Sequence, residues 1–230
     1  LRGLPFAKGM PSMVGYVFVT GLVLFPFGFF SASVKEQGFE SNLPLESMYL
    51  VSLAILVLSL FLLYFYRDPQ RTIESGIVSP ADGLVQRAEI KKGMVYFSIF
   101  MNVHNVHVNR SPFDGRVISI KHKSGGYLPA FSKDSDKNER LLTKIETSIG
   151  MMKVIQIAGV LVRRIVSYVK PNYEVAKGER IGLIHFGSRV DLSFESAGID
   201  ICVKKGDKVL AGQKLANYTP LSSLSTSEKI

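Results

Sequence analysis

The stretch SPADGLV at residues 79–85 returns as SPFDGRV at residues 111–117. A second internal repeat is less exact: VAKGERIGLI at 175–184 is similar to VKKGDKVLAGQKL at 203–215. Each copy places a glycine turn beside a run of strand-forming residues. Turn-and-strand units repeated in this way predict a compact β-sandwich or a barrel-like sandwich.

The region from 72 to 218 favours short strands separated by Gly, Asp or Pro. One helix is expected at 132–148, where a Ser/Asp-rich opening precedes apolar residues at helical spacing, and 158–169 is ambiguous between helix and strand. The KGD segment at 205–207 resembles a hairpin of biotinyl and lipoyl carrier domains. We therefore predict a mainly β domain with one or two short helices and a hairpin of the barrel-sandwich-hybrid type. The expected strands lie at 83–90, 94–101, 115–122, 153–159, 180–186 and 200–206.

Two apolar stretches precede this region. No residue is charged from 14 to 30 or from 47 to 66, and each stretch is about as long as a helix needs to cross the ~30 Å hydrocarbon core of a bilayer. The first contains Pro26 and could dip into the bilayer without crossing it, and a cleaved signal peptide is a rival interpretation. We expect an N-terminal transmembrane helical hairpin rather than a single span.

Basic residues flank the two stretches. Arg2 and Lys8 precede the first and Arg67 and Arg71 follow the second, whereas the loop between them carries mostly acidic charges. The positive-inside rule therefore places both ends of the hairpin in the cytoplasm. The expected organisation is a membrane anchor at 1–71, a cytoplasmic catalytic β-rich domain at 72–218 and a flexible tail at 219–230.

The composition narrows the choice of partners. The formal charge of +9 suggests an anionic partner, and the anionic cytoplasmic leaflet is available to a domain held at a bilayer. Nucleic acid is not expected, because the chain has no Trp and no basic run interleaved with aromatic residues. The single Cys202 agrees with a reducing compartment, and its alternating context predicts a buried strand residue. Exposed strand edges would allow a homodimer.

Three residues could perform serine chemistry. A serine becomes an effective nucleophile when a base takes its proton and a third group orients that base. The sequence offers Asp82 in PADG, His107 in NVHVNR and Ser188 in FGSR. Each also has a structural interpretation, because Asp82, like Asp114, could merely close a turn, His107 could be a strand histidine and Ser188 could serve a bulge. The four histidines form no convincing ligand set, so no metal is expected.

Taken together, these motifs and their surroundings resemble the membrane-bound short form of the phosphatidylserine decarboxylase family. The resemblance covers most of residues 64–218 in the family's order, and the apolar stretches stand where that family has its anchor. The combination of FGSRVD, NVHVNR and PADG is specific, although no one of them would be. The matching segments are YFYRDPQR, VSPADGLV, FMNVHNVHVNRSPFDGRV, GGYLPAFSKDSDKNERL, QIAGVLVRRIV, KGERIGLIHFGSRVDL and VKKGDKVLAGQKLANY.

The resemblance implies a precursor that cuts itself. In this family cleavage occurs at a Gly-Ser bond, here between Gly187 and Ser188, and the serine becomes an N-terminal pyruvoyl group. Ser188 Oγ would attack the preceding carbonyl, His107 would take the hydroxyl proton, and Asp82 would orient His107. Cleavage would produce a large chain, 1–187, and a small chain, 188–230, from one precursor.

The pyruvoyl group, which is a covalent pyruvate made from Ser188, would then serve as the cofactor. It would form a Schiff base with the serine headgroup of phosphatidylserine and accept electrons as carbon dioxide leaves, so that phosphatidylethanolamine is released. The implied protein is a lyase of phospholipid biosynthesis at the cell membrane, made as a zymogen. His104 and Arg110 are auxiliary candidates, because longer family members carry a second histidine in the stretch that matches NVHVNR.

The residues alone leave two other functions open. A membrane-tethered serine hydrolase using Ser188, His107 and Asp82 would keep its serine and remain one chain. A non-catalytic β-domain that binds anionic lipid would not depend on Ser188 at all.

Overall fold

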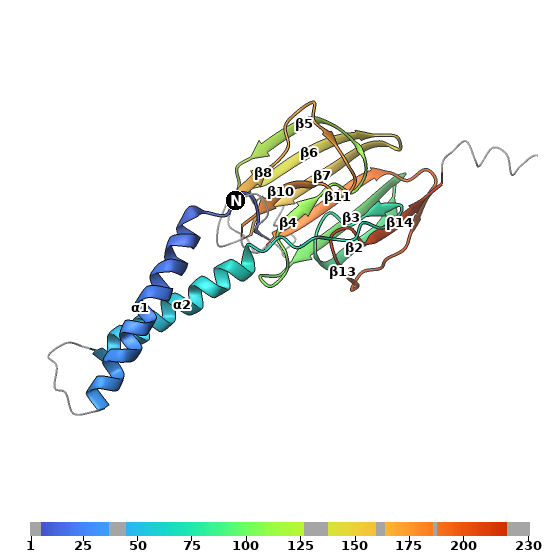
Figure 1. Ribbon diagram of the computed structural model, residues 1–230. Coiled ribbons are helices and arrows are strands. Elements are labelled where there is room, and N and C mark those ends of the chain that lie inside the picture. Colours follow the sequence, from blue (N-terminus) through green and yellow to red (C-terminus); the bar gives the residue numbers. More distant parts are fainter. Residues whose placement is uncertain (1–5, 37–44, 127–137, 160–163, 186–187, 220–230) are drawn as a thin grey trace, which may run out of the picture. The chain divides into compact units, whose positions relative to one another are not determined.

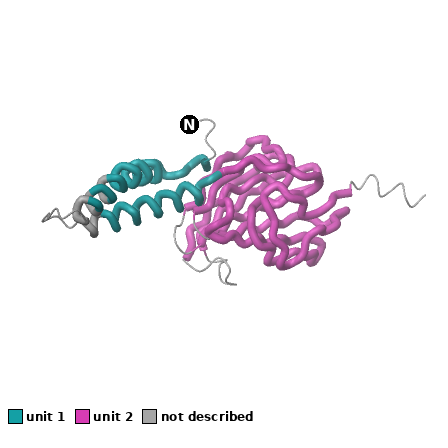
Figure 2. Tube along the Cα trace, turned by 60° about the horizontal axis from the view of Figure 1, so that its bottom comes forward, with its two compact units in different colours: residues 1–67 teal, residues 68–230 magenta. Residues whose placement is uncertain are grey.

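The computed structural model describes residues 6–36, 45–126, 138–159, 164–185 and 188–219. The chain divides into two compact units, Leu1–Arg67 and Asp68–Ile230 (Figure 2). The first unit contains both helices and the second contains the strands (Figure 1). The prediction of a mainly β fold accompanied by two N-terminal helices is therefore confirmed.

The first unit is an antiparallel pair of helices, α1 (Ser12–Glu36) and α2 (Leu45–Phe65). The helices approach closely at Gly21, where a Cβ would lie 3.1 Å from the backbone of Leu56. Nearer the connection between them, the rings of Phe25 and Tyr49 have centroids 5.9 Å apart. Within the described residues, neither helix has the combined length and hydropathy of a membrane-crossing segment.

The described residues of the second unit form one large sheet and two small ones, in which all the strand pairs are antiparallel. The large sheet has the order β13-β2-β3-β11-β7-β6-β5-β9. Its strands are β2 (Gly83–Lys91), β3 (Met94–Met101), β5 (Gly115–Lys123), β6 (Arg140–Thr147), β7 (Gly150–Ile157), β9 (Glu174–Val175), β11 (Ser188–Glu195) and β13 (Lys208–Val209).

The two small sheets have the orders β1-β14-β12 and β4-β10-β8. Their strands are β1 (Ile77–Val78), β4 (Val108–Arg110), β8 (Ile165–Ser167), β10 (Arg180–Ile184), β12 (Ile199–Ile201) and β14 (Lys214–Tyr218). β1 and β4 each lead into one copy of the S-P-x-D-G motif.

The two copies of this motif occupy equivalent positions in a duplicated architecture. The residue before each motif donates its backbone N–H to the proline carbonyl of the other copy, Val78 to Pro112 at 3.0 Å and Arg110 to Pro80 at 2.8 Å. The strand after the first copy, β2, pairs with β3 and β13, and the strand after the second, β5, pairs with β6 and β9. The repeated S-P-x-D-G sequences therefore belong to two structurally equivalent halves of the second unit.

One hydrophobic core joins the two halves. It contains alternate residues of β3 and β11, among them Phe97 and Phe194, whose ring centroids lie 6.4 Å apart. It also contains Met152 of β7 and Leu215 of β14, so one face of the large sheet contributes to the same cluster as a small sheet. β11 lies between β3 and β7, which makes it a central strand of the molecule.

The helix expected at 132–148 is wrong over its second half. Residues 140–147 form β6, which pairs with β7 in an antiparallel hairpin, and residues 132–137 lie outside the described residues. Leu141, Thr143 and Ile145 are buried in alternation with less buried neighbours, which is the two-residue period of a strand. No short helix occurs in the described part of the second unit.

Three smaller expectations have different outcomes. The ambiguous segment 158–169 contains the strand β8, and its residues 160–163 lie outside the described residues. Cys202 is exposed rather than buried, because it follows the end of β12. The expected tail begins at Thr219, whose N–H donates to the Gly198 carbonyl at 2.9 Å, and the rest of the tail, 220–230, lies outside the described residues.

Candidate active site

Ser188 is the first residue of the central strand β11. It pairs with Met101 at the end of β3. Val190, Leu192 and Phe194 lie in the core on alternate positions, so Ser188 has the same inward register. Its side chain is fully buried, and Oγ donates to the Met101 thioether at 3.3 Å. Gly187, the other half of the expected cleavage site, lies outside the described residues.

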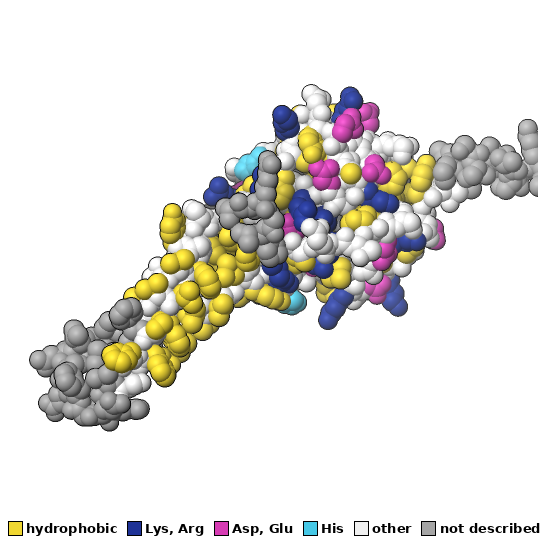
Figure 3. Space-filling view, in the orientation of Figure 1, with side chains coloured by type: hydrophobic (Ala, Val, Ile, Leu, Met, Phe, Trp, Pro, Cys, Tyr) yellow, Lys and Arg dark blue, Asp and Glu magenta, His cyan; other side chains and the backbone are white. Residues whose placement is uncertain are grey.

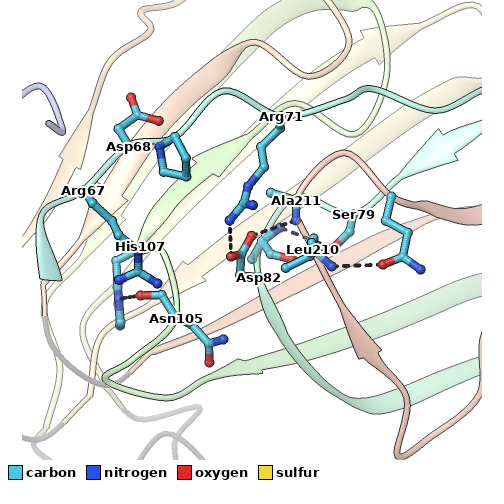
Figure 4. A network of polar contacts seen from close by, with 12 residues as sticks. Arg67, Asp68, Arg71, Ser79, Asp82, Asn105, His107, Leu210 and Ala211 are labelled. Atoms are coloured by element: carbon cyan, nitrogen blue, oxygen red, sulfur yellow. Dashed lines mark hydrogen bonds and ion pairs between the residues drawn. The ribbon is translucent and has the colours of Figure 1, made fainter. Parts of the chain in front are cut away.

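His107 lies directly before β4 and is fully buried. Its ring nitrogen Nδ1 lies 2.9 Å from the Asn105 carbonyl (Figure 4). A carbonyl only accepts hydrogen bonds, so Nδ1 carries a proton, and in the neutral form of the ring Nε2 would carry the lone pair. The His107 carbonyl also accepts from the N–H of Ile184 at 3.2 Å, which ties His107 to the strand that leads toward Ser188.

Asp82 is buried in the turn of the first S-P-x-D-G copy. One carboxylate oxygen accepts from the Ala211 N–H at 2.9 Å, and the other pairs with Arg71 at 2.5 Å (Figure 4). The structure thus brings Asp82 to Arg71 and not to His107. The orientation of His107 by Asp82 stays a prediction.

Asp114 occupies the equivalent place in the second copy but has different surroundings. Its carboxylate accepts from the Lys177 N–H at 2.9 Å, as Asp82 accepts from Ala211. Asp114 is exposed, whereas Asp82 is buried and paired with an arginine. The duplicated turn therefore supplies a structural role for both aspartates, and only Asp82 has a buried, ion-paired carboxylate.

The two auxiliary candidates differ in exposure. His104 is exposed in the turn 102–105. Arg110 is buried, and its guanidinium donates to the Gly178 carbonyl at 2.9 Å and to Asp68 at 3.3 Å. Burial, together with the neighbouring Arg180, lowers the pKa of Arg110 from its ordinary value. Asp68 also pairs with Arg180, so these two arginines share one buried carboxylate.

A buried pair of amides beside Ser188 was missed by the sequence analysis. Gln156 Nε2 donates to Asn109 Oδ1 at 2.7 Å, and Asn109 Nδ2 donates to the Met101 sulfur at 3.6 Å. That sulfur also accepts from Ser188 Oγ. The side chains form a continuous buried chain from β7 through β4 and β3 to Ser188. Asn109 in NVHVNR was visible in the sequence, but its contact with Gln156 is long-range and left no local signal.

His185 was also given no role by the sequence analysis, although it lies three positions before Ser188. It is buried, and its N–H donates to the Arg164 carbonyl at 3.1 Å. Burial, with a contribution from the Arg164 charge, lowers the pKa of His185 to about 4. The imidazole is therefore neutral at physiological pH. Its place in the stretch IHFGSRVDLS was the available signal.

Ser188 and His107 are both buried in the β-rich unit, and the His107 carbonyl accepts from Ile184 of the strand that leads toward Ser188. Across the described ranges, no group of three His, Cys, Asp or Glu residues could hold a metal ion. The catalytic role of Ser188 stays a prediction at this point.

Comparison with known proteins identifies the family. The model of the phosphatidylserine decarboxylase family matches residues 58–217. An archaetidylserine decarboxylase proenzyme, so named, of Methanococcoides burtonii is 51% identical over 161 residues, which are 69% of this chain and 75% of that protein. The phosphatidylserine decarboxylase proenzyme of Streptomyces coelicolor is 49% identical over 153 residues, 66% of this chain and 70% of its own. The chain therefore belongs to the phosphatidylserine decarboxylase family.

Among solved structures, the glucose permease IIA from Mycoplasma capricolum aligns with 61% of this chain and 92% of its own, at 16% identity and a TM-score of 0.38. That likeness is too low to bear on function. The family assignment makes this chain an enzyme, a phosphatidylserine decarboxylase proenzyme with a pyruvoyl cofactor. The family assignment therefore favours a decarboxylase over the two alternatives, a serine hydrolase and a non-catalytic lipid-binding domain.

Proposed function

We propose that the precursor cleaves itself between Gly187 and Ser188, giving chains 1–187 and 188–230, and that the mature enzyme converts phosphatidylserine to phosphatidylethanolamine. The observation that carries this proposal is the position of Ser188. A serine at the first position of a central strand can become a chain terminus while the β3-β11 and β11-β7 pairs stay in place. Its hydroxyl is buried against Met101, away from bulk water.

The residues around Ser188 fit a pyruvoyl group. Ser188 supplies its carbon atoms, and the surrounding Met101 and core residues exclude water. The group supplies an electron sink that favours the loss of carbon dioxide. The protein around it holds the terminus in the sheet and keeps the reacting centre dry, which strengthens every polar interaction there.

His107 is the proposed base for self-cleavage. Because its Nδ1–H is held by the Asn105 carbonyl, Nε2 of the neutral ring can take the Ser188 hydroxyl proton. Asp82 is the proposed third member of the group. Its carboxylate would orient His107 only by exchanging its pairing with Arg71, so Arg71 belongs to the same proposal as the ion-pair partner of Asp82.

The helical unit is the proposed membrane anchor. Large apolar side chains are exposed along both helices, including Tyr16 at 72%, Phe30 at 70% and Leu50 at 63% (Figure 3). A surface of this kind is unfavourable in water and is expected to be covered, and a bilayer covers it. Membership of a membrane-associated family and the basic flanks support a transmembrane hairpin with the catalytic domain on the cytoplasmic side.

A homodimer through exposed sheet edges is our proposal for the assembly, to be tested by light scattering of the detergent-solubilised protein.

The decarboxylase proposal is tested by activity on vesicles that contain phosphatidylserine. The wild-type protein should release carbon dioxide and form phosphatidylethanolamine, and Ser188→Ala should remain one folded, inactive chain. A Ser188→Ala protein that splits in two would refute the cleavage site. Release of fatty acid by an uncleaved wild-type protein would favour the hydrolase.

A further inference from the structure

Met101 is the partner of the Ser188 hydroxyl. It is the last residue of β3 and lies directly opposite Ser188 in the β3-β11 pair. Residues directly opposite each other in an antiparallel pair project from the same face of the sheet, and both side chains are fully buried. Ser188 Oγ donates to the Met101 sulfur at 3.3 Å. Met101 therefore forms the part of the core that the Ser188 side chain faces.

The acceptor in this contact is a weak one. A thioether sulfur accepts hydrogen bonds less well than a carbonyl or carboxylate oxygen, and otherwise it packs as an apolar group. Met101 belongs to the hydrophobic core cluster, together with Ile99 of β3 and Val190 of β11. One side chain thus combines an acceptor for the hydroxyl with the apolar surface of the core.

A buried amide pair also contacts this sulfur. Asn109 Nδ2 donates to the Met101 sulfur at 3.6 Å, and Asn109 Oδ1 accepts from Gln156 Nε2 at 2.7 Å. Gly182 of β10 leaves room for the Gln156 amide, since a Cβ at that position would lie 2.9 Å from Nε2. Two donors therefore meet at one sulfur, and the amide pair, which is fixed in β4 and β7, restricts where that sulfur can lie.

The proposed self-cleavage would remove the hydroxyl that Met101 holds. Ser188 Oγ bonds to the Gly187 carbonyl carbon as the peptide C–N bond breaks, and the hydroxyl proton passes to the nitrogen. Loss of the Ser188 α-proton to a base then breaks the Cβ–Oγ bond, so Oγ leaves as part of the Gly187 carboxylate. Cβ takes up a proton and becomes a methyl group, while water supplies the ketone oxygen and the nitrogen leaves as ammonia. The Met101 sulfur would thus face a hydroxyl before cleavage and a methyl group after it.

A thioether suits both of these neighbours. A hydrocarbon side chain at position 101 would leave the buried hydroxyl without this acceptor before cleavage. A carboxylate or amide there would place a strongly polar group against a methyl group after cleavage. Each alternative deprives a buried polar group of a partner in one of the two states, which is destabilising.

We propose that Met101 is a positioning residue for self-cleavage: its sulfur holds the Ser188 hydroxyl in the rotamer from which it attacks, and the same side chain packs against the methyl group of the mature residue. The proposal rests on the proposed function of Ser188. A serine side chain has three staggered rotamers, and an acceptor in the core stabilises the one that reaches it. Met101 therefore acts on the rate of cleavage and not on decarboxylation, for which no hydroxyl remains.

The experiment compares Met101→Leu with Met152→Leu. Both methionines are fully buried in the same core cluster, and leucine replaces either one at similar volume. Of the two, Met101 is the residue whose sulfur contacts Ser188. Loss of this hydrogen bond should slow cleavage of freshly expressed precursor by about fivefold in Met101→Leu. Met152→Leu should cleave within about twofold of the wild-type rate.

The cleaved proteins give a second readout. Each variant is incubated until cleavage is complete, and the rate at which hydroxylamine captures the carbonyl group of residue 188 is then followed by mass spectrometry. This rate, and kcat/KM on vesicles that contain phosphatidylserine, should stay within about twofold of wild type in Met101→Leu, because leucine also packs against a methyl group. A general packing defect would instead change the cleaved enzyme as well as the precursor.

Two results would overturn the proposal. One is a Met101→Leu precursor that cleaves as fast as Met152→Leu or faster. The other is a Met101→Leu protein that cleaves slowly and, once cleaved, also loses activity or hydroxylamine capture, which would assign Met101 to packing alone. A wild-type precursor that never cleaves would instead refute the function of Ser188, and that result is distinguishable because it requires no variant.

Discussion

His107 is the residue on which self-cleavage should depend most after Ser188 itself. His107→Gln removes the ring nitrogen that accepts the serine proton, and we expect cleavage to slow by about 100- to 10,000-fold. His122→Gln is the matched control, since His122 is half-exposed on β5 and pairs with Glu139 at 2.9 Å. Gel time courses of freshly expressed precursor give both rates. Equal cleavage of the two variants would remove His107 from the mechanism.

His185 should make the stability of the precursor depend on pH. Its pKa of about 4 in the folded protein lies below the ordinary value of 6.5, so the unfolded chain binds more protons between these two values. The contribution of His185 to the free energy of unfolding is fully present above pH 6.5 and is lost as the pH falls toward 4. Between pH 7 and pH 5 the loss should be about 2 kcal/mol.

Urea unfolding of the Ser188→Ala precursor at both pH values measures this loss, because that background keeps every sample in one chain. When His185→Gln is added to Ser188→Ala, the free energy of unfolding should fall by about 2 kcal/mol less between pH 7 and pH 5 than in Ser188→Ala alone. Identical pH dependence with and without His185 would show that the imidazole titrates normally.

The duplicated S-P-x-D-G turns provide an internal control among the structural elements. Both aspartates accept a backbone N–H from the hairpin opposite, but only Asp82 is buried and paired with an arginine. Asp82→Asn leaves Arg71 without its charge partner and should slow cleavage by about tenfold or more, with a stability loss of about 1–3 kcal/mol. Asp114→Asn should cleave at close to the wild-type rate. Equal slowing by both substitutions would indicate a purely structural role for the turn.

The elements differ in how far local sequence could predict them. The alternation of MVYFSIFM and the glycine turns around it predicted β3 correctly, because both signals lie within one strand. For β6 the adjacent Leu141 and Leu142 with Ile145 matched a helical spacing, and only pairing with β7 reveals the strand period. The paired apolar helices were predicted because their length and lack of charge are local properties.

The active site was predictable to the extent that its motifs are local. Ser188 and His107 are both buried, and Ser188 contacts Met101 at the end of β3, but a shared site for the two residues stays a prediction. The partner of Asp82 was not predictable, because Arg71 and Ala211 are brought to it by the duplicated fold. The amide pair Asn109 and Gln156 depends in the same way on strands that are distant in the chain.

The topology of the whole β-rich unit implies that cleavage does not separate the chains. A chain beginning at residue 188 contributes β11, β12, β13 and β14, and β11 stays paired with β3 and β7 on its two sides. We expect the two chains to elute together in gel filtration of the solubilised enzyme and to separate only in concentrated guanidinium. Release of the small chain under native conditions would contradict this arrangement of β11.

The most direct test of self-cleavage at Ser188 is intact-protein mass spectrometry of the purified protein, with and without hydroxylamine. We expect two chains, the smaller one beginning at residue 188 with a blocked terminus whose mass shifts when hydroxylamine traps a carbonyl group. A single unmodified chain from folded, mature material, or a small chain with a free serine amine, would contradict the conversion of Ser188 to a pyruvoyl group.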